Sequence, residues 1–199
     1  MSMTNDSDGT LEPEDKEAEL LQAARTALNT FRAHGEQHLW PTTDKHGNPL
    51  PRLDVDNPRT TTDDPLLRVG YALLPQLPGD WEVAILHVTV AADEVRTFAT
   101  VKDRGRPPLE GRLHYPGVSA ELAEACVALR RATYEPDGRG VWYNANIRLE
   151  RNGAIAALYD FVNPPFGCWG PNEVELARRD QELYPRDPQQ LPVWHPSCS

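Results

Sequence analysis

Residues 141–165, VWYNANIRLERNGAIAALYDFVNPP, constrain the fold of this chain more than any other stretch, because they predict a β-hairpin. Two runs of alternating apolar and polar residues flank Asn152-Gly153. Asn-Gly is the strongest short signal for a two-residue hairpin turn, since both turn positions need a positive φ. Such a turn fixes the register of the two strands. The predicted cross-strand pairs are Leu149 with Ala156, Arg148 with Ala157, and Ile147 with Leu158.

The two faces of this predicted hairpin differ in chemistry. One face is apolar and is expected to lie in the core: Tyr143, Ala145, Ile147, Leu149, Ala156 and Leu158. The other mixes aromatic, amide and charged side chains: Trp142, Asn144, Asn146, Arg148, Glu150, Ile155, Ala157, Tyr159 and Phe161. Such a mixture is typical of a recognition surface, or of a face that another segment of the chain covers. For Phe161 alone, packing beneath the C-terminal helix is the simpler interpretation.

The remaining segments predict an α+β fold, an antiparallel sheet with helices packed on one face. The expected order is helix, long loop, strand pair, helix, β-hairpin, helix. Helical periodicity marks residues 14–34, a helix capped by Ser119, and a third helix that Asn172 caps with Glu175 three positions on. Strands are predicted at residues 81–90 and 95–102, joined by a turn at Asp93-Glu94. Consecutive strands with short connections pair antiparallel, which gives the sheet its class.

Seven prolines punctuate residues 37–79 and exclude a long helix there. This segment is expected to form a surface loop or a strap that crosses the domain, with a short strand at residues 66–74. Four aspartates give it an acidic character: Asp54, Asp56, Asp63 and Asp64. The predicted organisation is a disordered N-terminus (1–12), an N-terminal helix (13–35), a Pro-rich acidic loop (36–79), an α+β core (80–184) and a Pro-rich tail (185–199). Within the core, residues 103–116 are expected to be a Gly/Pro-rich loop.

The composition restricts the function classes. A formal net charge of −10 over 199 residues argues against direct binding to nucleic acid, and it suits a basic protein partner. No apolar run approaches the roughly 18 residues that span a bilayer, and the first residues lack the pattern of a secretory signal. The three cysteines have no paired spacing, which fits a reducing, cytoplasmic setting.

No catalytic motif is visible, and neither a metal nor a cofactor is expected. The chain has no G-x-S-x-G, no phosphate-binding glycine loop and no H-E-x-x-H. Cys126 falls on the apolar stripe of a predicted helix, where a thiol behaves as a small hydrophobe. Two groups of side chains could be considered as metal ligands, but neither has the spacing of a zinc site: His34, His38, Asp44 and His46, and Cys168, His195 and Cys198.

Two alternative functions remain: a small enzyme of unrecognised type that uses His87, His114 or the aspartates, and a ligand-binding or scaffold protein. Taken as single residues, Trp81 and Trp142 are most simply core or semi-core anchors. Trp169 and Trp194 fall in loop and tail, where aromatic residues more often mark contacts. For Trp194, the alternative is that the tail folds back and packs it onto the sheet.

The layout of several segments carries a resemblance to a known family. These are Trp81-Glu82, the helix at 119–134, Trp142, the Asn152-Gly153 turn, Tyr159-Asp160-Phe161, and the ending of residues 182–186 with Pro192-Val193-Trp194. Together they resemble the YezG-like immunity proteins of bacterial polymorphic toxin systems. The resemblance implies a cytoplasmic protein that binds a cognate toxin domain, often a nuclease, and blocks it by occlusion, with no catalytic residue of its own. A second α+β immunity superfamily, the one that resembles a yeast cell-wall regulator, is the alternative within this class.

The predicted toxin contacts combine the outer hairpin face with the acidic segment. They are Trp142, Asn144, Arg148, Tyr159, Asp160, Asp54, Asp56, Asp63 and Asp64. An acidic surface suits a basic nuclease domain, whose own active-site cleft must attract phosphate. The expected mechanism is steric and electrostatic masking of the toxin's active site.

Overall fold

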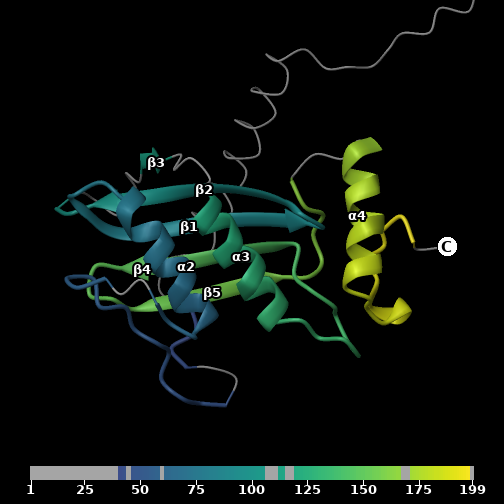
Figure 1. Cartoon of the computed structure of the whole chain (residues 1–199), viewed down its shortest axis with the longest axis horizontal. Helices are drawn as coiled ribbons and strands as arrows, with labels where there is room; N and C mark the ends of the chain where they lie inside the picture. The colour runs from purple at the N-terminus through teal and green to yellow at the C-terminus, as the bar shows by residue number, and fades with distance from the viewer. Residues whose placement is uncertain are drawn as a thin grey trace, which may run out of the picture. The chain divides into compact units, whose positions relative to one another are not determined.

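A five-stranded antiparallel sheet, in the order β3-β2-β1-β4-β5, forms the centre of the fold in the computed structural model (Figure 1). The model describes residues 40–43, 46–58, 61–105, 119–166 and 171–197, and the backbone of 112–114. The strands are β1 (Trp81–Ala91), β2 (Glu94–Asp103), β3 (Arg112–His114), β4 (Asn144–Glu150) and β5 (Ile155–Asp160). The helices are α2 (Pro65–Leu73), α3 (Ala120–Ala132) and α4 (Pro171–Leu183), with short 3₁₀ turns at Leu74–Gln76 and Pro188–Gln190. The predicted α+β class is confirmed. The predicted helix at 13–35 and residues His34, His38, Asp44, Cys168, Trp169 and Cys198 lie outside the described part.

Helices α2 and α3 pack against each other and against the same face of the sheet (Figure 1). The register places apolar side chains in rows beneath them: Leu86 of β1 pairs with Ala99 of β2 on one side and Ile147 of β4 on the other. All three side chains are buried. The Ser119 side chain accepts a hydrogen bond from Leu122 N, so α3 begins at the predicted cap. Helix α4 packs against β1 and stands apart from α2 and α3 in Figure 1.

The strand predicted at residues 66–74 is wrong, because this stretch forms α2. Asp64 caps the helix by accepting hydrogen bonds from the backbone N–H groups of Leu66 and Leu67, at 2.8 and 3.0 Å. Pro65 occupies the first turn, where no N–H is needed. Val69, Ala72 and Leu73 are buried, and their spacing of three and four is that of a helix.

The predicted hairpin register is wrong by one residue. The observed pairs are Leu149 with Ile155, Arg148 with Ala156, and Ile147 with Ala157. The loop has three residues, since Glu150 N donates to Ala154 O (2.9 Å) and Gly153 N donates to Glu150 O (2.8 Å). Gly153 has φ +87°, whereas the described non-glycine residues with positive φ are Ala92 and Phe166 alone. Asn152 therefore lacks the positive φ that a two-residue Asn-Gly turn demands, and the geometry is that of a turn followed by a glycine bulge.

This shift exchanges the two faces of β5, because side chains alternate along a strand. Tyr159 lies on the face that α2 and α3 cover and packs against the core, while Ala156 and Leu158 lie on the opposite face. Trp142 is fully buried and stacks on Tyr159, with ring centroids 5.7 Å apart. The prediction that these two aromatic residues face outward is therefore wrong.

Residues 40–43 and 46–53 form a strap beside the hairpin end of the sheet. Trp40 lies beside Arg148, with 6.0 Å between the guanidinium carbon and the indole ring. Leu53 N donates to Gly153 O at 2.8 Å. The Leu53 side chain is buried against Gly70 and Ile155, within the apolar core. Of the two alternatives for residues 37–79, these contacts favour a strap for the described residues 40–43 and 46–53.

Three local boundaries also differ from those expected. Residues 112–114, within the predicted loop, form the short strand β3. The β1–β2 turn consists of Ala92 and Asp93, since Ala91 pairs with Glu94. Helix α4 begins at Pro171, so Asn172 lies inside its first turn and is not its N-cap.

Candidate binding surface on the open face of the sheet

The face of the sheet opposite α2 and α3 is called the open face; α4 reaches it at one end, where Glu173 lies 3.8 Å from Arg96, and its Ile85, Thr100 and Ala156 are buried. Its members come from four strands and follow from the register: Val83, Ile85, His87 and Thr89 (β1), Arg96, Phe98, Thr100 and Lys102 (β2), Asn144, Asn146, Arg148 and Glu150 (β4), and Ala156, Leu158 and Asp160 (β5). Polar and apolar side chains are mixed across it.

His87 occupies the middle of the open face. Its Nδ1 lies 2.8 Å from Asn146 Oδ1, and its Nε2 lies 2.7 Å from Thr100 Oγ1. A carbonyl oxygen can only accept, so Nδ1 carries the proton and Nε2 accepts from the hydroxyl. The ring also stacks on Phe98, with centroids 4.4 Å apart. Burial lowers the pKa of His87 to about 4 against the opposing effect of the Asn146 hydrogen bond, so the imidazole is neutral at pH 7.

Arg148 lies one row further toward the hairpin turn. Its Nε is 3.2 Å from Glu150 Oε1, and its guanidinium group faces the Trp40 ring. Asn146 beside it is exposed. The centre of the open face thus offers an amide, a guanidinium group and an imidazole–phenyl stack.

A loop, residues 161–166, crosses one end of the open face along a single cross-strand row. This row consists of Asp160, Asn144, Thr89 and Arg96, which the register places side by side on β5, β4, β1 and β2. Asp160 Oδ1 accepts from Val162 N and Asn163 N at 2.9 and 3.0 Å. Asn144 Nδ2 donates to the carbonyls of Asn163 and Pro164 at 3.1 and 3.3 Å. Thr89 Oγ1 accepts from Phe166 N at 2.8 Å, and the Arg96 guanidinium group lies 4.2 Å from the centre of the Phe166 ring.

The C-terminal tail holds the same loop from the other side. Trp194 Nε1 donates to Val162 O at 2.5 Å, and its ring meets Tyr143 edge-on, with centroids 4.9 Å apart. Arg186 donates to Phe161 O at 3.3 Å and to Val141 O at 2.6 Å. Trp194 therefore follows the predicted alternative in which the tail folds back.

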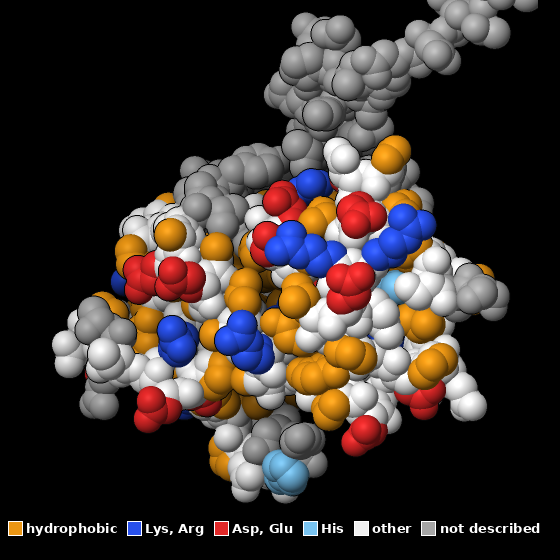
Figure 2. Space-filling view, turned by 45° about the vertical axis from the view of Figure 1, so that its right-hand side comes forward, with side chains coloured by type: hydrophobic (Ala, Val, Ile, Leu, Met, Phe, Trp, Pro, Cys, Tyr) orange, Lys and Arg blue, Asp and Glu red, His pale blue; other side chains and the backbone are white. Residues whose placement is uncertain are grey.

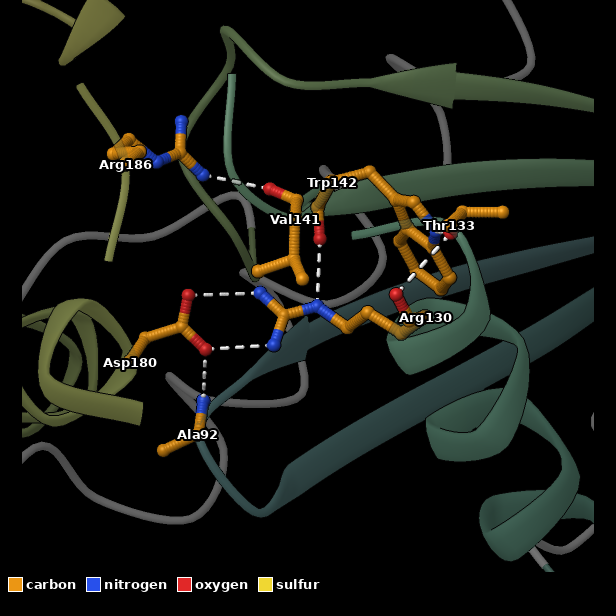
Figure 3. A network of polar contacts seen from close by, with 7 residues as sticks. All are labelled: Ala92, Arg130, Thr133, Val141, Trp142, Asp180 and Arg186. Carbon is orange, nitrogen blue, oxygen red and sulfur yellow. Dashed lines mark hydrogen bonds and ion pairs between the residues drawn. The ribbon is translucent and has the colours of Figure 1, made fainter. Parts of the chain in front are cut away.

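A buried polar network anchors α4 and the tail (Figure 3). The Asp180 carboxylate of α4 accepts hydrogen bonds from both terminal nitrogens of Arg130 and from the backbone N–H of Ala92. Arg130 Nε also donates to Trp142 O at 2.7 Å. Sequence reasoning missed Arg130, and the signal for it was its spacing of four from Cys126, which puts it on the buried stripe of α3.

The predicted contact residues divide between two sides of the sheet. Asn144 and Arg148 lie on the open face, as predicted, and Asp160, which was predicted as a contact but not on that face, lies there because of the one-residue shift. The acidic residues lie beside α2 on the other side: Asp64 caps that helix and approaches Tyr159, and Asp54 N donates to Tyr71 Oη of α2 at 3.1 Å. Asp54, Asp56 and Asp63 are exposed. Thr89 and Arg96 were not predicted, because only the loop contacts single them out.

The reactive side chains of the described residues sit in unreactive surroundings. Burial raises the pKa of the Cys126 thiol to about 12. Burial, and then the charge of Arg186, lower the pKa of His195, whose Nδ1 accepts from Ser197 N at 3.2 Å. Within the described ranges, no three His, Cys, Asp or Glu side chains are grouped so that they could hold a metal ion.

Surface charges of opposite sign lie close together on the face that Figure 2 shows, with hydrophobic side chains between them. Ion pairs near α4 illustrate this mixing: Arg179 with Asp93 at 3.3 Å, and Arg178 with Glu175 at 3.6 Å.

In the described part of the chain, no helix has the length and apolar character needed to cross a membrane. No protein-family model matches the chain, and neither does any curated protein.

Proposed function

We propose that this chain is an immunity-type protein that binds a cognate bacterial toxin domain and occludes its active site. The observation that carries the proposal is the division of the sheet into two faces. One face is buried under α2 and α3, and the open face combines an exposed amide, part-exposed aromatic and guanidinium groups, and a loop fixed across its end. Aromatic, arginine and amide side chains of this kind are characteristic of protein interfaces.

The state of His87 also supports recognition. Both of its ring nitrogens are hydrogen-bonded to neighbours on the sheet, and it is neutral near pH 7. A general base needs a free nitrogen within reach of the proton that it removes. In the present arrangement, the imidazole orients Asn146 and Thr100 and contributes to the shape of the open face.

The charge distribution suggests separate tasks for the two sides of the sheet. The open face carries the cations Arg96, Lys102 and Arg148 together with the carboxylates Glu150 and Asp160, whereas the exposed carboxylates of Asp54, Asp56 and Asp63 lie beside α2. With a net charge of −10, the chain attracts a basic domain from a distance. We therefore assign the carboxylates beside α2 to steering and the open face to contact, which revises the single combined surface expected from sequence.

The first test is co-expression with the C-terminal domain encoded by the neighbouring reading frame. Rescue of growth and co-purification as a tight complex would support the immunity function. A neighbour without a toxin domain, or the absence of both rescue and complex, would count against it.

Contact by the open face is tested with a pair of matched variants. Asn146→Lys changes an exposed amide at the centre of the open face, and Asn172→Lys changes an exposed amide on α4. We expect the first to weaken the complex by about tenfold or more and the second to leave it unchanged. Equal affinities for the two variants would remove the open face from the interface.

Steering is tested by charge reversal. Asp54→Lys with Asp56→Lys should slow association at low salt, whereas Glu121→Lys with Glu124→Lys alters the net charge equally on exposed positions of α3. An unchanged association rate for the variant with Asp54→Lys and Asp56→Lys would exclude these carboxylates from the encounter.

A further inference from the structure

Large hydrophobic side chains that are strongly exposed are few in the described part of the chain: Val162 at 66%, Leu183 at 52% and Val193 at 96%. Val162 and Val193 belong to two segments that Trp194 joins, the loop 161–166 and the C-terminal tail. The Trp194 indole N–H donates to the Val162 carbonyl, and Val193 precedes Trp194 in sequence. An exposed valine at the tip of a mobile loop needs no explanation, but Val162 lies in a loop that is held in place.

The backbone around Val162 is satisfied by side chains from several other elements. The N–H and C=O of Val162 pair with Asp160 and Trp194, and the carbonyls of Phe161 and Asn163 pair with Arg186 and Asn144. Irregular loops more often leave such groups to water. Here five side chains and two consecutive prolines fix the loop before any partner arrives.

The loop also contains an unfavourable backbone conformation. Phe166 has φ +68°, a region that costs an ordinary L-residue free energy and is kept only where the surroundings enforce it. The Thr89 hydrogen bond and the Arg96 guanidinium group hold Phe166 there, with its ring buried. The chain thus accepts strain to give residues 161–166 one defined shape.

We propose that Val162 is an anchor residue for the partner protein, inserting its side chain into a small apolar pocket on the toxin domain, with Val193 at the rim of the contact. This inference rests on the proposed immunity function and names one contact of that function. A preformed loop avoids the entropy of ordering on binding, so a modest apolar anchor can contribute fully to affinity. The loop's backbone groups are already paired, so the partner recognises its side chains.

The test compares the affinity of the toxin domain for the wild-type chain, Val162→Asp and Leu183→Asp. Both variants place a carboxylate at a strongly exposed position, so both should unfold at the wild-type temperature. We expect Val162→Asp to weaken the complex by about tenfold or more, mainly through faster dissociation. Leu183→Asp should bind as the wild type does, and Val162→Ala should fall between.

The outcomes separate this inference from the proposed function. If the wild-type chain forms no complex with the toxin domain, both are overturned. A tight wild-type complex that Val162→Asp matches in affinity overturns the anchor alone. Equal weakening by Val162→Asp and Leu183→Asp also overturns it, because the effect would then follow from added charge and not from position.

Discussion

Asp180 and Arg130 form a two-pronged ion pair inside the protein, with Oδ1 to Nη1 at 2.7 Å and Oδ2 to Nη2 at 2.8 Å (Figure 3). Both side chains are only 2% exposed. Asp180 Oδ1 also accepts from Ala92 N at 2.8 Å, so one carboxylate joins α4, α3 and the β1–β2 turn. Arg186, a second buried cation, donates instead to the carbonyls of Val141 and Phe161.

Removing this carboxylate should destabilise the fold strongly. In Asp180→Ala, the buried charge of Arg130 loses its partner and the Ala92 N–H loses its acceptor. Breaking a buried pair in this way typically lowers the free energy of unfolding by about 3–5 kcal/mol. Urea unfolding followed by circular dichroism measures the change. Arg178→Ala is the control, because it breaks an exposed ion pair with Glu175 and should cost less than about 1 kcal/mol. Equal losses for the two variants would contradict this account.

The β1–β2 turn offers a substitution that should stabilise the protein. Ala92 has φ +52°, where an alanine is strained by about 1–2 kcal/mol and a glycine is not. Glycine costs about 0.5–1 kcal/mol more entropy on folding, so Ala92→Gly should gain up to about 1 kcal/mol. Ala91→Gly, in the adjacent buried strand position, should lower stability instead. A loss of stability in Ala92→Gly would show that the turn is not strained.

Most elements set by short-range signals were predictable, and those set by distant contacts were not. Helix α2 is the exception, because its Asp64 cap and helical spacing were local signals that the strand prediction overlooked. The Ser119 cap and the alternation of β4 act within a few residues, and both were found from sequence. The hairpin register was not, because the Asn152-Gly153 pair suits a two-residue or a three-residue loop. The observed loop packs against the carbonyl of Leu53, about which the hairpin sequence says nothing.

The candidate site shows the same limit. Asn144 was identified because it alternates with apolar neighbours on a recognisable hairpin, and Asp160 because it belongs to the Tyr159-Asp160-Phe161 segment that carries the family resemblance. Thr89 and Arg96 complete their row only after the sheet order places β1 beside β4 and β2 beside β1. Trp142 and Tyr159 were assigned to the wrong face, the first because it precedes β4, and the second because of the one-residue shift.

Gly153 should be the least replaceable of the glycines with positive φ. It has φ +87°, and a Cβ built there would lie 2.1 Å from the Leu53 carbonyl oxygen, which is too close for any real contact. Gly47 and Gly105 have φ +81° and +77° but open space around them. Gly47→Ala and Gly105→Ala should therefore cost only the conformational penalty of about 1–2 kcal/mol. Gly153→Ala should cost clearly more in thermal or urea unfolding, because the strap must also move. Similar losses at all three positions would show that the strap yields without cost.

His87 should make stability depend on pH between about 6.5 and 4. Its pKa is about 4 in the folded protein and near 6.5 when unfolded, so the unfolded chain binds the extra proton in this range. Its contribution is fully present above pH 6.5 and is lost as the pH falls toward 4, by at most about 3 kcal/mol.

The measurement is urea unfolding from pH 7.5 to 4 for the wild type and His87→Gln. Glutamine can pair with Asn146 and Thr100 but takes up no proton, so its stability should fall less steeply in this range. The lowered pKa of His195 acts in the same direction in both proteins, and the difference between the two curves isolates His87. Parallel curves would mean that His87 can be protonated on the folded sheet, and that its hydrogen bonds to Asn146 and Thr100 do not require the neutral ring.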